Sequence, residues 1–272
     1  MEGKFKHALN LSGGLHHAHK DKASGFCIYN DIVLAIRFLL KEYKARVVYI
    51  DTDAHHGDGV QAAFYNDPNV LTISMHETGK YLFPGTGSVS ELGEGLGFGF
   101  SVNVPMEPFT QDESWLNTFR EVVIPLTRAF KPDIIISQNG CDAHHLDPLT
   151  HLSVTMESFA TIPSLVHDLA HELCEGRWLA LGGGGYEPWL VVPRAWSLVW
   201  SKMTDRTLDS EIPLTWLTKW EAKSGLILPK TISDSWLQVP EIPRRREITE
   251  KNYLAGQRAV NSVSGIILGN LG

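Results

Sequence analysis

The chain alternates short apolar runs with longer segments in which apolar residues recur at helical spacing. Six runs of four to six residues are rich in branched and aromatic side chains, which is typical of strands buried on both faces. Because helix-length segments separate most of these runs, the pattern predicts a mainly parallel sheet covered by helices on both faces. We predict strands at residues 7–11, 46–51, 70–75, 100–104, 133–137 and 178–181.

Residues 30–44 carry the clearest helix pattern. Apolar side chains at Ile32, Ile36 and Leu39 are three and four positions apart, which places them on one face of a helix. Together with the strands, this pattern predicts an α/β fold of three layers, αβα. We predict further helices at residues 57–65, 111–129, 156–173 and 188–202.

The composition of the sequence changes at about residue 205. Proline-punctuated segments with Trp216, Trp220 and Trp236 lead to the charged stretch PRRREITEKN and then to a weakly polar, glycine-containing tail. We interpret residues 1–205 as one domain and residues 206–272 as a C-terminal extension that packs on the same domain.

Composition excludes several classes of protein. The chain has 272 residues, of which 43% are hydrophobic, but no apolar run reaches the roughly 20 residues that a membrane span needs. The net charge of −7 argues against nucleic-acid binding, which requires a basic face, and favours basic protein segments as partners. The first six residues contain no apolar core of a secretory signal, and three cysteines without a CxxC pair favour a reducing compartment, so we expect a cytoplasmic protein.

The eight residues DTDAHHGD directly follow the predicted strand at 46–51. While the chain stays extended, Asp51, Asp53 and His55 share one face because side chains alternate in a strand. Asp142 follows another apolar strand and is the best third ligand, since the carboxyl ends of parallel strands meet at one edge. Two carboxylates and an imidazole leave a coordination position open, as a catalytic zinc site requires, and suit Zn²⁺ or Fe²⁺. The alternative is a polar loop of capping and turn residues.

Twelve histidines include a tandem pair, His16 and His17, preceded by two glycines. Histidine can remove a proton from a metal-bound water and return it to a departing amine near neutral pH. Each ring would need a carboxylate on its far nitrogen, and Asp51 and Asp58 are available. Binding of a second metal and a plain surface position are the alternatives.

Four glycines precede Tyr186 after the last predicted strand. The flexible turn could bring the phenol to the site as a hydrogen-bond donor for a developing oxyanion. The alternative is a buried tyrosine that packs after a turn. Phe26 and Phe83 lie in glycine-flanked loops; aromatic residues are core residues by default, but beside a metal cleft they would line an apolar channel.

Other residues near these motifs are assigned no chemistry. Cys27 and Cys141 lack a sequence context that would activate a thiolate, so we interpret them as spectators. We interpret His144, His145 and His151, which follow the third ligand, as solvated rim residues.

Five motifs, in this order along the chain, resemble those of the zinc-dependent histone deacetylase superfamily over about residues 8–200. They are GGLHHAHKDKASGFCIYND, YIDTDAHHGDGVQAAFY, FPGTG, QNGCDAHHLDPL and LALGGGGY. The resemblance implies an arginase-like α/β fold and hydrolysis of acetylated lysine side chains to lysine and acetate. It implies an acetylated protein as the substrate; an acyl-CoA synthetase would suit it, while histone tails and polyamines stay open.

The resemblance also implies a role for each motif residue. His17 matches the general base and acid, His16 its electrostatic partner, and Tyr186 the group that polarises the acetyl carbonyl. Metal ligands would be Asp53, His55 and Asp142, with Asp51 and Asp58 behind the two histidines. Substrate would be bound by Gly25, Phe26, Phe83, Leu149 and Gly184. A structural K⁺ would be held by side chains of Asp51 and Ser74 and by carbonyls of Asp53, His55 and Met75.

The chain departs from the family in one respect. Family members have a long N-terminal part of the domain before the GGLHHA motif, which here begins at residue 13. We therefore expect this chain to lack that part and to expose apolar sheet surface. Two alternatives follow: a binuclear manganese ureohydrolase of the arginase type, and a non-catalytic remnant of a deacetylase.

Overall fold

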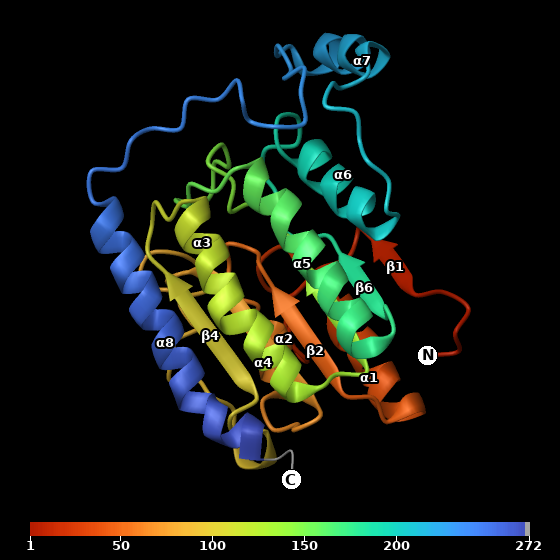
Figure 1. The fold of residues 1–272 in the computed structure, drawn as a ribbon, viewed down its shortest axis with the longest axis vertical. Coiled ribbons are helices and arrows are strands. Elements are labelled where there is room, and N and C mark those ends of the chain that lie inside the picture. Colours follow the sequence, from red (N-terminus) through yellow and green to blue (C-terminus); the bar gives the residue numbers. More distant parts are fainter. Residues whose placement is uncertain (270–272) are drawn as a thin grey trace.

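The computed structural model describes residues 1–269, which form a sheet of six strands with helices on both sides (Figure 1). All strand pairs are parallel, and the order across the sheet is β1-β6-β5-β2-β3-β4. The strands are β1 (His7–Asn10), β2 (Val47–Asp51), β3 (Val70–Glu77), β4 (Ser101–Met106), β5 (Ile134–Gln138) and β6 (Trp178–Leu181). The predicted strands and the predicted α/β class are therefore confirmed.

Alternating side chains of the central strand β2 enter two different cores. Val48 and Ile50 belong to a large core that includes residues of the helices on one face, whereas Val47 and Tyr49 pack with residues of the helices on the other. All five residues of β2 are buried, which explains why the strand is a continuous apolar run rather than an alternating one. These two cores make the three layers that the sequence predicts.

The two helical layers contain different parts of the chain. Residues of α1 (Asp31–Tyr43) and α2 (Asp58–Phe64) form the smaller core, and α3 (Asp112–Thr118), α4 (Ile124–Phe130) and α5 (Met156–Cys174) contribute to the larger one. The remaining helical elements are a 3₁₀ turn η1 (Gly95–Gly97), a π-helical turn η2 (Phe119–Val123), α6 (Val192–Met203), α7 (Leu214–Ser224) and α8 (Arg245–Gly269).

The predicted helix at 111–129 is one run of three segments, in which η2 separates α3 from α4. Pro125 lies in the first turn of α4 and has no backbone N–H to donate, so the regular hydrogen-bond ladder cannot continue through it. The helix at 30–44 is confirmed as α1, where the side chain of Asn30 accepts a hydrogen bond from Val33 N.

Two helices after residue 205 are absent from our sequence interpretation. The long helix α8 runs beside β4, while α7 lies apart from the sheet (Figure 1). The buried amide of Asn252 fastens α8: it accepts from Glu107 N at 2.9 Å and donates to Thr110 Oγ1 at 2.8 Å and Ser114 Oγ at 2.9 Å. A buried asparagine at the start of the packed face and interior glycines at 256 and 265 weaken the amphipathic pattern, so the sequence does not predict this helix.

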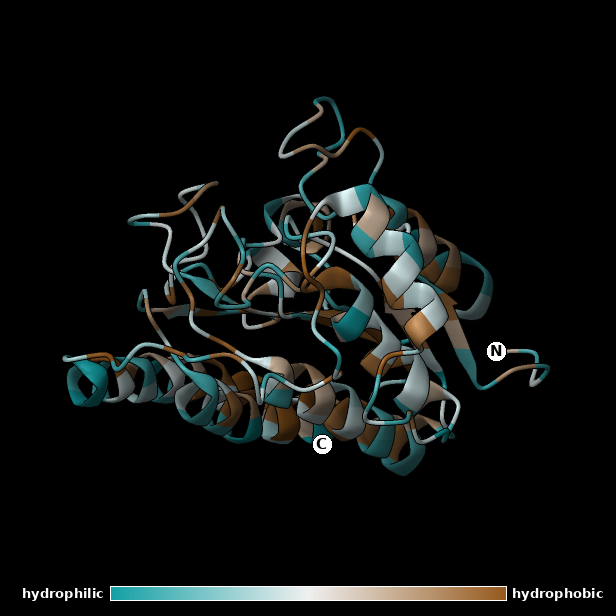
Figure 2. Cartoon of the chain, turned by 90° about the horizontal axis from the view of Figure 1, so that it is seen from above, coloured by the Kyte–Doolittle hydropathy of each residue, from teal (hydrophilic) through white to brown (hydrophobic). Residues whose placement is uncertain are grey.

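Figure 2 shows brown and teal residues mixed along the helices. Within residues 1–269, no helix is long and apolar enough to cross a membrane. Several apolar side chains on or just before α1 remain exposed: Ile28, Tyr29, Leu34 and Phe38 are each more than half exposed.

Candidate metal and acid–base centre

Loops that follow four neighbouring strands meet at one edge of the sheet. Since all the strands are parallel, their carboxyl ends lie at the same edge, where α/β proteins bind ligands. The predicted site residues come from these loops: His16 and His17 after β1, Asp53 and His55 after β2, Asp142 after β5, and Tyr186 after β6.

Asp53, His55 and Asp142 form a compact buried cluster, referred to below as the carboxylate–imidazole trio. Nδ1 of His55 lies 2.8 Å from Asp142 Oδ2 and 3.2 Å from Asp53 Oδ1, and one ligand atom from each residue lies within 4.8 Å of the others. Burial and the neighbouring Asp53 raise the pKa of Asp142 to about 7. Two carboxylates and one imidazole, all buried, are oxygen and nitrogen donors that fit a divalent cation such as Zn²⁺.

The local backbone of the trio is a turn and not the extended strand that we assumed. β2 ends at Asp51, and the next residues bend because Asp51 Oδ1 accepts from Asp53 N at 3.1 Å and Asp53 Oδ1 accepts from His55 N at 2.9 Å. Asp51 does not join the trio: its Oδ2 lies 2.8 Å from His16 Nδ1 and accepts from Tyr49 Oη at 2.7 Å. The predicted residues meet, but alternation along a strand is the wrong reason.

Neighbouring polar groups hold the two carboxylates in place. Gln138 Nε2 and Gly184 N each donate to Asp53 Oδ2 at 2.7 Å, and Ala54 N donates to Asp142 Oδ1 at 2.7 Å. Gln138 is absent from our predicted site, although it ends a mostly apolar strand and is the first residue of the motif QNGCDAHHLDPL. These donors fix the trio before any ion binds.

The tandem histidines are each paired with a different carboxylate. His16 Nδ1 lies 2.8 Å from Asp51 Oδ2, His17 Nδ1 lies 2.7 Å from Asp58 Oδ1, and the two Nε2 atoms are 3.1 Å apart. Burial and the neighbouring His16 lower the pKa of His17. Burial also disfavours charged His16, but the carboxylates of Asp51 and Asp53 outweigh it and raise the pKa to about 9. The pair therefore carries one extra proton near neutral pH, on His16.

The aromatic residues flank this cluster. The ring centroid of Tyr186 is 6.2 Å from that of His55, and the ring of Phe83 is 5.0 Å from that of His17. Phe26 is 84% exposed and Phe83 49% exposed, so neither is the core residue that an isolated phenylalanine would be by default. Burial and the negative charge of Asp53 raise the pKa of Tyr186, so its phenol keeps its proton and can donate.

Asp147, a residue outside our predicted site, positions two of the predicted residues. Its Oδ2 accepts from Tyr186 N at 2.8 Å and its Oδ1 accepts from Leu149 N at 2.9 Å. Gly25 has a positive φ of 52°, and a side chain there would collide with the ring of His17. The ring centroid of Phe26 is 6.0 Å from that of Tyr186, whereas Leu149 is linked to the centre only through Asp147.

The residues assigned to a monovalent cation also lie together. Asp51 and Ser74 are directly opposite each other in the β2–β3 register, and both are buried, as is Met75. Ser74 Oγ lies 2.8 Å from His76 Nδ1. Occupation of this position by K⁺ stays a prediction.

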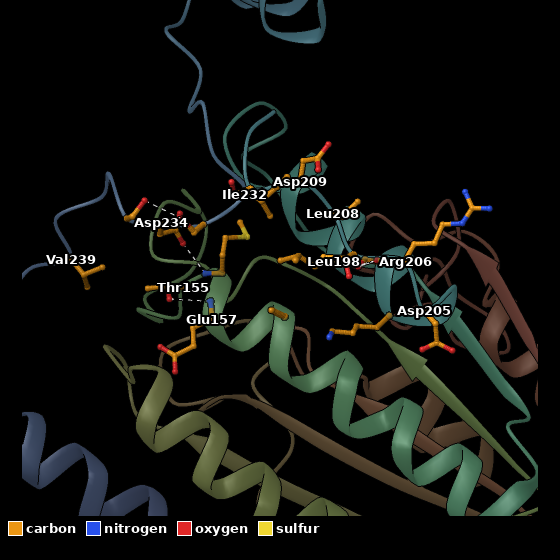
Figure 3. Close-up of a pocket in the computed structure, with 18 residues that line it drawn as sticks. Thr155, Glu157, Leu198, Asp205, Arg206, Leu208, Asp209, Ile232, Asp234 and Val239 are labelled. Carbon is orange, nitrogen blue, oxygen red and sulfur yellow. Dashed lines mark hydrogen bonds between the residues drawn. The ribbon is translucent and has the colours of Figure 1, made fainter. Parts of the chain in front are cut away.

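One of the three histidines interpreted as rim residues is buried instead. His144 is fully buried, and its Nε2 lies 3.0 Å from Asp234 Oδ2, which also accepts from Met156 N at 2.7 Å. Asp234 lies in the wall of a pocket of about 720 Å³ between α5, α6 and the loop that follows α7 (Figure 3). A residue 90 positions away thus decides the burial of His144, which the local sequence cannot reveal. His151 is half-exposed and lies 2.7 Å from Glu77 Oε1.

The chain belongs to the histone deacetylase family, because the sequence model of the histone deacetylase domain matches residues 1–203. It is 52% identical over 263 residues to the acetoin utilization protein AcuC of Bacillus subtilis (strain 168) and 51% identical over 253 residues to AcuC of Staphylococcus aureus (strain COL). These matches cover 97% and 93% of this chain, but 68% and 65% of the relatives.

Solved structures agree with the family and the fold. The crystal structure of an HDAC homolog from Aquifex aeolicus superposes with a TM-score of 0.80 at 30% sequence identity, over 92% of this chain and 67% of that one. An HDAC homolog complexed with SAHA gives the same values. The family resemblance predicted from the five motifs is therefore confirmed, and the chain spans about two thirds of the length of these relatives.

Proposed function

We propose that this chain is a zinc-dependent hydrolase that removes acetyl groups from lysine side chains. One observation carries the proposal: a histidine paired with a carboxylate and a phenol both lie close to the same carboxylate–imidazole trio. The ring centroids of His17 and Tyr186 are 5.9 Å and 6.2 Å from that of His55. Amide hydrolysis needs these groups together: a cation site, a proton carrier and a donor for the oxyanion.

The trio would hold Zn²⁺ through Asp53, His55 and Asp142, and a bound zinc ion polarises a carbonyl and makes water more acidic. In this scheme His17 donates a hydrogen bond from Nδ1–H to Asp58, which leaves Nε2 as the basic nitrogen. This nitrogen accepts the proton of the attacking water and then delivers it to the departing lysine amine, so that lysine and acetate are released.

Two further groups stabilise charge in this scheme. Tyr186 donates its phenolic hydrogen to the oxyanion that forms from the acetyl carbonyl. His16, paired with Asp51, stays cationic beside His17 and favours the negative charge that develops in the cleft. Asp51 and Ser74, with the carbonyls of Asp53, His55 and Met75, would bind the K⁺ that stiffens the same loop.

The rings of Phe26 and Phe83 would contact the aliphatic stem of the acetylated lysine, with the carbonyl of Gly25 accepting from a substrate amide and Leu149 and Gly184 completing the walls. A protein substrate, such as an acyl-CoA synthetase, suits this open and exposed rim. Three buried free cysteines suit the reducing cytoplasm.

The tandem histidines favour this function over a binuclear manganese ureohydrolase. Their Nδ1 atoms are both engaged by carboxylates, which suits proton transfer better than ligation of a second ion. Buried donors on both carboxylates of the trio likewise favour a working centre over a non-catalytic remnant.

The test is an assay of the zinc-loaded chain with an acetyl-lysine peptide and, separately, of the manganese-loaded chain with arginine. We expect acetate and free lysine peptide in stoichiometric amounts, and no urea. Release of urea from arginine, or no acetate from a chain that demonstrably holds zinc, would overturn the proposal.

A further inference from the structure

A second group of histidines lies at the opposite end of the sheet. His7 is the first residue of β1, whereas His16 and His17 follow the last residue of the same strand. His167 and His171 lie on α5, whose C-terminal end is close to the start of β6, the strand next to β1 (Figure 1). We refer to these three residues as the β1–α5 histidine cluster.

The three rings are close enough to share one ion. The ring centroids of His7 and His167 are 5.0 Å apart, those of His7 and His171 5.3 Å, and those of His167 and His171 4.5 Å. One ligand nitrogen from each lies within 4.8 Å of the others. His167 and His171 are four positions apart on a helix, and this spacing places two imidazoles on one face, as in helical zinc-binding pairs.

Two imidazole nitrogens of this cluster lack a hydrogen-bond partner among the described residues. His7 Nδ1 and His167 Nε2 are buried and have no hydrogen-bond partner in the part of the chain that the structure describes. Buried imidazole nitrogens are normally paired, so these two are available for a ligand.

A carboxylate completes the set of donors. Asp205 Oδ1, in the turn after α6 (Figure 3), lies 3.8 Å from His167 Nε2, which is too long for a hydrogen bond. Two atoms bound to one tetrahedral zinc at 2.0–2.2 Å are about 3.3–3.6 Å apart, so a small movement of this exposed side chain suffices.

We propose that His7, His167 and His171, with Asp205 as fourth ligand, bind one Zn²⁺ that fastens the edge strand β1 to α5. Three imidazoles and a carboxylate are a donor set that suits zinc. Four protein ligands close the coordination sphere, so this ion is structural. The site is independent of the trio, since β1 separates the two along its length.

The experiment is a zinc titration of the full chain by calorimetry, repeated with His171→Gln, Asp142→Ala and the control His145→Gln. His171 is exposed, so its replacement does not threaten the fold, and the side chain of half-buried His145 lies outside both sites. We expect two ions for the parent and for the control, and one ion for each of the other variants. Zinc-edge anomalous diffraction should give a peak among the three rings.

The experiment distinguishes a failure of the proposed β1–α5 site from a failure of the proposed catalytic site. Loss of one ligand should weaken the second ion more than about tenfold, since even outer-sphere changes cost that much. If His171→Gln binds as many ions as tightly as the parent, the β1–α5 site is excluded. A parent that binds one ion, lost in His171→Gln and kept in Asp142→Ala, would support this site and contradict the proposed catalytic one.

Discussion

The carboxylate of Asp58 lies 2.7 Å from Nδ1 of His17 and thereby determines which nitrogen of that imidazole can accept a proton. Asp58→Asn removes the charge that holds this tautomer and stabilises the protonated ring. We expect kcat for acetyl-lysine hydrolysis to fall about 10–100-fold with zinc content unchanged. Asp209→Asn, an exposed change away from the centre, is the control. An unchanged kcat in Asp58→Asn would show that His17 is not the proton carrier.

Tyr186→Phe removes a single oxygen, and the ring keeps its place beside His55. Loss of one oxyanion donor costs about 10²–10³ in kcat. We expect this loss in an acetate-release assay, with KM and zinc content close to those of the parent. Tyr253→Phe, at an exposed position of α8, should leave the rate unchanged. If Tyr186→Phe keeps more than half of the parental kcat, the phenol does not stabilise the oxyanion.

The sequence predicts the fold well where burial is visible in the local pattern. Strands buried on both faces are continuous apolar runs, so β2 and β5 are predicted correctly. Asp53 and Asp142 are predicted together because both follow strands of one parallel sheet. Helix α8 is not predicted, since its buried face carries Asn252, whose partners are more than a hundred residues away.

Residues that hold other site residues in place are not predicted from the sequence, for a similar reason. Gln138 and Asp147 touch the centre only through Asp53 and Tyr186. Both lie in the motif QNGCDAHHLDPL, but the motif does not indicate which of its residues position Asp53 and Tyr186. The same holds for His144, which is buried by Asp234 from a distant loop. Side-chain chemistry is readable from the sequence, but a hydrogen-bond partner brought in by the tertiary fold is not.

Asn252→Ala should destabilise the chain and loosen α8. The change leaves Glu107 N and Ser114 Oγ without a partner, at about 1–3 kcal/mol for each unsatisfied group, while Thr110 Oγ1 keeps its bond to the carbonyl of Glu107. Asn261→Ala is a matched control, because Asn261 is exposed on the same helix. Urea unfolding should show a loss of at least about 2 kcal/mol for the first variant and less than about 0.5 kcal/mol for the second. Equal losses would mean that α8 is not fastened at Asn252.

Asp234 makes the stability of the chain depend on pH. Burial alone would raise its pKa, but hydrogen bonds with His144, Met156 N and Arg194 outweigh this and hold the pKa at about 2, against an ordinary value of 3.8. A carboxylate with a lowered pKa stabilises the fold above about pH 4, and this contribution is lost as the pH falls from 4 towards 2.

Asp234→Asn should therefore cost about 3 kcal/mol at pH 7, the lower end for a broken buried ion pair. Below pH 4 the difference from the parent should shrink, because the unfolded parent then binds a proton at Asp234 that the folded parent binds only near pH 2. Urea unfolding of the parent and the variant at pH 7, 5 and 3 measures this difference in unfolding free energy. A difference that stays constant over this range would contradict the assignment.

The most direct measurement is the rate of acetate release from an acetyl-lysine peptide while zinc is removed from the chain and then restored. If Asp53, His55 and Asp142 hold the catalytic ion, the stripped chain has no activity above background and zinc restores the full rate. Asp142→Ala regains less than about 1% of that rate under the same treatment, because a charged ligand is lost. A stripped chain that turns over at the parental rate, or an Asp142→Ala chain that zinc fully restores, would contradict the proposed centre.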